Sequence, residues 1–195
     1  MGLEVEYQAV PDNAAVLVRA RIDAAYSERI YGVSTFRRDE IFPPSDQVEL
    51  ELQRDVKSLL VLHPGLEHRN FDIDRQWDAL TYLLSENRRQ SEFEKLDLGA
   101  AAVLGMQEFP HNGAQGIPTR YSSSEDLRRI FDYLAPISRD DLFEHYDLAK
   151  MKTSAVYKMW NEDGYDIYLW RLFEGLRDFY QLVLSHNEGV LVFTD

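Results

Sequence analysis

The sequence lacks three features that would each point to a class of function. Cysteine is absent, which excludes disulfide bonds, thiolate metal ligands and a cysteine nucleophile. No apolar run approaches the roughly 18 residues that a membrane-spanning helix needs. Cations are scarce, because 21 lysines and arginines stand against 34 aspartates and glutamates, and the formal net charge is −13. We therefore expect neither a membrane span nor nucleic-acid binding, since a duplex binder needs a cationic face.

Sequence patterns of catalysis and cofactor binding are missing as well. No Gly-x-Ser-x-Gly pattern supplies a hydrolase nucleophile, and residues 113–116 lack the glycine spacing and the lysine of a phosphate loop. No two histidines have the i, i+4 spacing that places two imidazoles on one helix face; the five are His63, His68, His111, His145 and His186. We predict no metal site and no cofactor.

The length of 195 residues and the mass of 22.7 kDa suit one domain, because domains most often contain roughly 100 to 150 residues and single domains of about 200 are common. We predict a single domain over residues 1–195. The first residues, Met-Gly-Leu-Glu-Val-Glu, lack the basic and then apolar order of a secretory signal. We therefore expect a cytoplasmic protein.

Local patterns predict one strand and two helices in the first third of the chain. Residues 3–9 alternate between apolar and polar side chains, which is typical of a strand with one buried face. Apolar residues at helical spacing then predict a helix to about Tyr31, and residues 32–44 form a surface connection. Ser45 or Asp46 can cap a second helix, whose apolar face contains Val48, Leu52, Val56 and Leu59 and which ends before Pro64.

The stretch from Asp72 to Leu84 combines a helix start with a buried tryptophan. Asp72 or Asp74 can accept a hydrogen bond from a free helix N–H group, and its charge favours the positive end of the helix dipole. Ile73, Trp77, Leu80 and Leu84 share one helix face, so we expect the indole to be buried.

The second half of the chain predicts further helices and at least one strand. Residues 100–104 form a short strand or an apolar loop, and residues 117–121 form a strand. Residues 122–125 and 138–141 resemble capping boxes of two helices, the second a short one through His145. A long helix within residues 164–187 precedes a strand at 190–193 that is buried on both faces. These elements predict an α+β fold, a small mixed β-sheet covered by several helices.

Several short motifs occur in order along the chain and resemble those of the YfbM-like family, a group of small bacterial proteins defined as a domain of unknown function. They are Met1-Gly2 and Tyr7; a Trp-Asp-x-Leu-x-Tyr-Leu-Leu run at 77–84; Ala-Val-Leu-Gly at 102–105; Gly116, Arg120 and Tyr121; Asp147 and Met151; Tyr157 and Trp160; and Leu176, Phe179 and Tyr180. The resemblance implies an α+β fold and a bacterial cytoplasmic origin, but no activity. This chain departs from the family at Thr81, where family members often have histidine, at Ser85-Glu86 in place of Thr-Gly, and at Lys158, where proline is common.

One group of residues combines polar side chains and aromatics with a turn-rich loop at 105–116. Its members are Trp77, Asp78, Gln107, His111, Arg120, Tyr121, Tyr157 and Trp160. They can line a ligand pocket. The alternative is structural: the aromatics are core, and Arg120 pairs with Asp78 or Asp163.

Two functions are consistent with this sequence. The first is a non-catalytic binding protein, in the manner of small acidic immunity or adaptor proteins, that recognises a basic protein through charge. The second is an enzyme or small-molecule binder, in which Arg120 holds a carboxylate or phosphate and His111 or Asp78 handles a proton. The net charge and the missing catalytic motifs favour the first.

Overall fold

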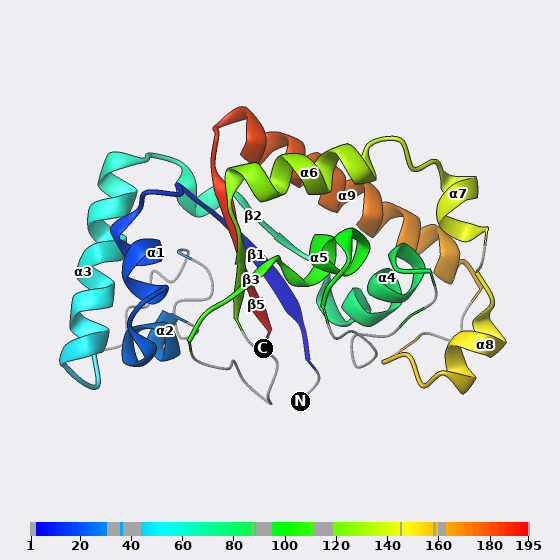
Figure 1. The fold of residues 1–195 in the computed structure, drawn as a ribbon, viewed down its shortest axis with the longest axis horizontal. Helices are drawn as coiled ribbons and strands as arrows, with labels where there is room; N and C mark the ends of the chain where they lie inside the picture. The colour runs from blue at the N-terminus through cyan, green and yellow to red at the C-terminus, as the bar shows by residue number, and fades with distance from the viewer. Residues whose placement is uncertain are drawn as a thin grey trace.

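The final strand of the chain, β5 (Gly189–Thr194), is the centre of a five-stranded sheet in the order β2-β1-β5-β4-β3. β1 (Val5–Val10) and β4 (Arg120–Ser122) pair with it on its two sides, and Figure 1 shows it between them. Every residue of β5 is buried, as a continuous apolar run predicts for a strand covered on both faces.

The edge strands are short: β2 (Asn70–Asp72) pairs with β1, and β3 (Gln107–Glu108) pairs with β4. All four pairings are antiparallel, whereas we expected a mixed sheet. The period of two in a strand specifies which face is buried but not the direction of its neighbour.

This computed structural model describes residues 3–30, 36, 44–86, 88, 95–110, 119–144, 146–157, 159 and 163–194.

Helices cover both faces of the sheet, which confirms the α+β fold (Figure 1). One side has α1 (Ala15–Ala20), α2 (Ala24–Ile30) and α3 (Gln47–Leu62). The other side has α4 (Trp77–Leu84), α5 (Leu98–Leu104), α6 (Ser124–Leu134), α7 (Arg139–Phe143), α8 (Leu148–Thr153) and α9 (Tyr165–Ser185). Short 3₁₀ turns at Leu66–His68 and Asp74–Gln76 flank β2.

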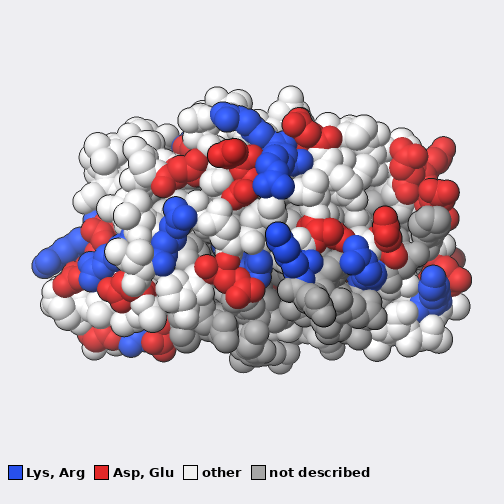
Figure 2. Space-filling model, in the orientation of Figure 1, with Lys and Arg blue, Asp and Glu red and all other residues white. Residues whose placement is uncertain are grey.

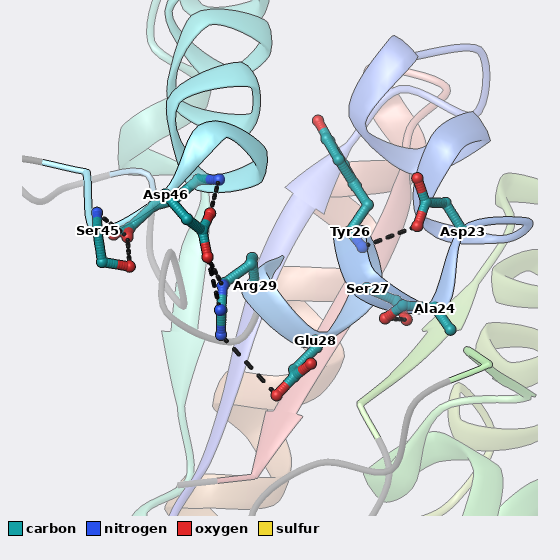
Figure 3. Close-up of polar contacts among 9 residues, drawn as sticks. Asp23, Ala24, Tyr26, Ser27, Glu28, Arg29, Ser45 and Asp46 are labelled. Carbon is teal, nitrogen blue, oxygen red and sulfur yellow. Dashed lines mark hydrogen bonds and ion pairs between the residues drawn. The ribbon is translucent and has the colours of Figure 1, made fainter.

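The single helix predicted to reach about Tyr31 is instead the pair α1 and α2, described as far as Ile30. The break lies at residues 21–23, where the Asp23 carboxylate accepts a hydrogen bond from the Tyr26 N–H at 3.1 Å (Figure 3). Aspartate favours such side-chain caps over a helix interior. Apolar residues keep their helical spacing on both sides of residues 21–23, so the sequence pattern did not indicate the break between α1 and α2.

Polar contacts join α1 and α2 to α3. Arg29 binds the Asp46 carboxylate at 2.6 Å, and the same carboxylate caps α3 by accepting from the Glu49 N–H at 2.8 Å (Figure 3). The predicted cap and the predicted end of α3 before Pro64 are both confirmed. Most of the predicted connection at 32–44 lies outside the described residues.

Residues 100–104, predicted as a strand or an apolar loop, are instead the second part of helix α5. Asp97 caps this helix by accepting from the Ala100 N–H at 2.8 Å, and every residue from Gly99 to Leu104 is buried. A helix that is apolar all round has no hydrophobic face, so its sequence shows no helical period.

Gly99 allows α5 to approach the end of α4 closely. A Cβ atom at this position would lie 2.0 Å from the backbone oxygen of Leu84. We expect Gly99→Ala to lower the free energy of unfolding by about 3 kcal/mol, at the upper end of overpacking effects, because backbone must move. Gly175→Ala is the matched control in denaturant unfolding, since its Cβ would meet only the side-chain ring of Phe71. An equal loss in both variants would contradict this account.

The second half of the chain largely follows its local signals. The first capping box uses Ser123 and Asp126, one residue later than predicted, and the second uses Ser138 and Asp141 as predicted. The long helix is confirmed as α9. Helix α8, capped by Asp147, was not predicted.

Candidate functional site

The predicted site residues that the structure describes fall into two groups, each with hydrogen bonds of its own. The first group lies at the start of α4. Here the Asp78 carboxylate accepts a hydrogen bond from the Tyr157 N–H at 2.8 Å, and the Trp77 ring lies 5.9 Å from the Tyr157 ring. The Tyr157 hydroxyl accepts from the Leu3 N–H at 2.7 Å, and the Trp77 indole N–H donates to the Leu3 carbonyl at 3.2 Å. These contacts fasten the N-terminal segment and the segment after α8 to α4.

The second group, Gln107, Arg120 and Tyr121, lies on the β3–β4 hairpin. The Arg120 guanidinium donates to the carbonyls of Gly105 and Met106, at 2.9 and 3.1 Å, and to the Glu108 carboxylate. Burial lowers the pKa of Arg120 from its usual value, while the Glu108 carboxylate opposes that shift. This arginine is therefore already bonded within its own hairpin.

Gln107 and Tyr121 also have partners within the chain. The Gln107 amide donates to Asp126 at 2.8 Å, and the Arg21 guanidinium lies 5.2 Å from the centre of the Tyr121 ring. Arg21 was absent from the sequence-based group, because it lies 100 residues earlier and its spacing carries no signal.

The pairing predicted for Arg120 was wrong. Among the described residues its ion pair is with Glu108 and not with Asp78 or Asp163. His111 and Trp160 lie outside the described residues, so the proposed combination of Asp78, His111 and Arg120 stays a prediction.

Gln76 adds a buried polar contact that the sequence did not indicate. Its amide oxygen accepts from the Tyr165 hydroxyl at 2.6 Å, and Gln76 is fully buried. Burial raises the pKa of Tyr165, and the neighbouring groups that add to this shift include Asp78. Tyr165 therefore stays a neutral hydrogen-bond donor, which suits a contact that orients the start of α9 against α4.

Asp72 and Asp74, the two residues predicted to cap α4, lie at the end of β2 and in the 3₁₀ turn that precede this helix. The Asp72 carboxylate accepts from the Asp74 N–H at 2.5 Å and begins the 3₁₀ turn that leads into α4. The prediction that Asp72 or Asp74 caps α4 was wrong, because the N-cap of α4 is Gln76 and no side chain makes a cap bond there. Burial raises the pKa of Asp72. The predicted burial of Ile73, Trp77, Leu80 and Leu84 is confirmed.

Other residues of the family-like motifs meet at the C-terminal end of α5. The Tyr180 hydroxyl donates to the Ala102 carbonyl at 2.5 Å, and the Tyr7 hydroxyl donates to the Val103 carbonyl at 2.7 Å. The last four carbonyls of a helix have no partner inside the helix, and in a buried helix an unsatisfied carbonyl is costly. Tyr7 and Tyr180 supply the missing donors. Their role is therefore the stability of α5.

We expect Tyr180→Phe to lower the free energy of unfolding by about 1–3 kcal/mol, because the buried Ala102 carbonyl loses its donor. Tyr146→Phe is the control in denaturant unfolding, since Tyr146 is only partly buried. A Tyr180→Phe variant as stable as the control variant would contradict the role of this bond.

The buried tyrosines also predict a loss of stability in alkali. Burial raises the pKa of Tyr7 and of Tyr180 above the usual value. Such groups contribute stability that is complete below the unfolded pKa, about 10, and that is lost as the pH rises further. We expect the free energy of unfolding to fall above about pH 10, and to fall less steeply in Tyr180→Phe. Denaturant unfolding at a series of pH values measures both slopes, and equal slopes would contradict the prediction.

Two kinds of site are absent from the part of the chain that the structure describes. No group of three or more His, Cys, Asp or Glu side chains there could hold a metal ion. No helix there has the length and apolarity to cross a membrane.

Comparison with known proteins assigns a family. A search of curated proteins finds no match. The crystal structure of YfbM from Escherichia coli, a protein of unknown function, is similar in fold, with a TM-score of 0.58 and 16% sequence identity over 98% of this chain and 99% of that one. The family model described as "Domain of unknown function (DUF1877)" matches residues 1–193. The chain therefore belongs to the DUF1877 family, as its YfbM-like motifs indicated.

Proposed function

We propose that this protein is a non-catalytic binding protein that docks a basic protein partner through an acidic surface at one end of the molecule. The observation that carries the proposal is a group of five exposed carboxylates within residues 132–147. We call this group the acidic end; its members are Asp132, Asp140, Asp141, Glu144 and Asp147. Figure 2 shows acidic side chains gathered around α7.

The acidic end has little compensating charge of its own. Arg139 is the one lysine or arginine within residues 132–147, and its guanidinium is bound by a further carboxylate, that of Asp166, at 2.7 Å. Lys150 and Lys152 follow Asp147 on α8, so the acidic end stops where these two lysines begin. A surface whose charge has one sign attracts a partner of opposite charge. This attraction raises the association rate and selects among partners.

Several acidic side chains elsewhere are paired with arginine. Glu51 pairs with Arg19, Asp46 with Arg29 and Glu4 with Arg75. These pairs reduce the local excess of negative charge around α1 to α3 and near β2. Residues 132–147, from the end of α6 to the start of α8, contain five acidic residues and one arginine, so this segment is locally acidic.

The alternative of an enzyme receives less support from the described residues. Asp78 is only 1% exposed and binds the Tyr157 N–H, and the Arg120 guanidinium is bonded to three acceptors within its hairpin. A substrate carboxylate or phosphate would have to displace those acceptors. The residues of the acidic end are exposed at the surface, where a partner can reach them.

The test is affinity capture from the native host at low and at high salt, with the bound proteins identified by mass spectrometry. Asp140→Asn combined with Glu144→Gln neutralises two carboxylates of the acidic end and leaves the capping residue Asp141 in place. Glu28→Gln combined with Glu125→Gln is the matched control, because it removes the same charge from exposed positions on α2 and α6.

We expect the wild type and the control variant to retain the same basic protein at low salt, and the acidic-end variant to lose it. High salt should release the protein from all three, because ions screen exposed charges. A surface that serves solubility alone would respond equally to both charge changes. Equal loss in both variants, or no basic protein bound to the wild type, would overturn the proposal.

A further inference from the structure

The outward side of α3 exposes two large apolar residues near its C-terminal end. Val61 is 79% exposed and Leu62 is 74% exposed. Together with Lys57 and Ser58 they line a shallow, open depression of about 380 Å³ in the protein surface. Single exposed apolar residues are ordinary, but here two of them lie side by side next to the polar side chains of Lys57 and Ser58.

The charge on this side of α3 is opposite in sign to the charge of the whole chain. Two acidic residues of the helix turn toward α1 and α2, where Glu51 binds Arg19 at 2.6 Å and Asp55 accepts from the Tyr26 hydroxyl at 2.7 Å. Arg54 and Lys57 are exposed beside the apolar pair. We call Arg54, Lys57, Ser58, Val61 and Leu62 the cationic face.

The cationic face and the acidic end lie at opposite ends of the molecule. Figure 1, in which the longest axis is horizontal, places α3 at one end and α7 with α8 at the other. The acidic end also has an exposed apolar neighbour, since Ile167, 48% exposed, follows Asp166 on α9 and Asp166 binds Arg139 of α7. Each end therefore presents charge of one sign beside exposed apolar surface.

We propose that the cationic face binds the acidic end of a second copy of this chain, so that copies associate head to tail. The inference rests on the proposed function and extends it, because the cationic face of a second copy is a local basic surface that the same acidic end can bind. Two different surfaces meet in such a contact, so it is heterologous and can extend from copy to copy unless the geometry closes a ring. A second copy fits the depression because it presents carboxylates to Arg54 and Lys57 and apolar surface to Val61 and Leu62.

The self-association should be weak and should need salt. Each copy has a formal net charge of −13, so the copies repel one another at very low ionic strength. At about 0.15 M salt, charges separated by more than roughly 8 Å are screened, and the direct contact between the two ends remains. We therefore expect association to be strongest at intermediate salt.

The experiment measures weight-average mass against protein concentration by sedimentation equilibrium near physiological salt. One variant, Arg54→Glu with Lys57→Glu, reverses the cationic face, and a second, Asp140→Lys with Glu144→Lys, reverses two positions of the acidic end. All are surface positions, and circular dichroism checks that both variants stay folded. We expect the mass of the wild type to rise above 22.7 kDa with concentration, and each variant alone to associate at least about tenfold more weakly.

Mixing the two variants gives the decisive result. Each mixed pair retains one functional contact, between the acidic end of the first variant and the cationic face of the second. We expect an equimolar mixture to associate at concentrations where each variant alone does not, because one native contact remains and the two reversed ends are themselves opposite in charge. Glu28→Lys with Glu125→Lys is the control that makes the same charge change elsewhere, and it should associate at least as well as the wild type.

A wild type that stays at 22.7 kDa at high concentration would overturn the self-association. A mixture that fails to associate while the wild type associates would also overturn it, since the contact would then involve other surfaces. Both outcomes leave the proposed function to its own test, the capture of a basic host protein by the acidic end.

Discussion

Glu188→Ala is expected to lower the free energy of unfolding by about 3–5 kcal/mol, because it leaves the Arg69 guanidinium buried without its partner. Arg69 and Glu188 form two hydrogen bonds, at 2.9 and 2.7 Å, and their side chains are only 12% and 5% exposed. The pair joins the residue before β2 to the residue before β5. Denaturant unfolding measures the loss.

The control for this prediction is Glu28→Ala. Glu28 is paired with Arg29, but its side chain is 51% exposed, and exposed ion pairs contribute only about 0–1 kcal/mol. The double variant Arg69→Met with Glu188→Leu should recover much of the stability, because it removes both buried charges together. A single variant as stable as the control would show that the buried pair does not hold these two strands.

Trp77→Ala is expected to lower the free energy of unfolding by about 3–5 kcal/mol, the usual loss for a buried aromatic side chain. Trp77 is 5% exposed, packs against Tyr157 and donates to the Leu3 carbonyl. Trp170→Ala is the comparison, since Trp170 is only partly buried and should lose less. A denaturation midpoint that Trp77→Ala leaves unchanged would contradict the role of this residue as a core anchor.

Features that depend on local patterns were predicted well from the sequence. The burial of Trp77 and Leu80, the Asp46 cap of α3, the Ser138 capping box and the buried strand β5 all follow from spacing or from one side chain that caps nearby backbone. In each case the interactions that define the element lie within a few residues.

Features that depend on tertiary contacts were missed. The helix α5 is apolar on every side and shows no helical period, and the edge strands β2 and β3 are too short to alternate. The Arg69 and Glu188 ion pair joins residues 119 positions apart. Such contacts have no local signal, because they arise only when the sheet has formed.

The candidate site was predicted only in part for the same reason. Asp78 and Tyr157 do meet, through the Asp78 carboxylate and the Tyr157 N–H. Arg120 and Tyr121 belong to a different network, because the β3–β4 hairpin uses the Arg120 guanidinium to bind Gly105, Met106 and Glu108. The sequence identified residues that are able to bind a ligand, but it did not show which of them hydrogen-bond to one another, because those partners are far apart in the chain.

The most direct test of the account is the dissociation constant of the captured basic partner, measured against salt concentration for the wild type and the two neutralised variants. We predict that Asp140→Asn with Glu144→Gln weakens binding at least about tenfold at low salt, that Glu28→Gln with Glu125→Gln changes it little, and that rising salt weakens binding of the wild type. Equal affinities for the acidic-end and control variants, or binding of the wild type that salt leaves unchanged, would contradict the proposal that the acidic end binds the partner.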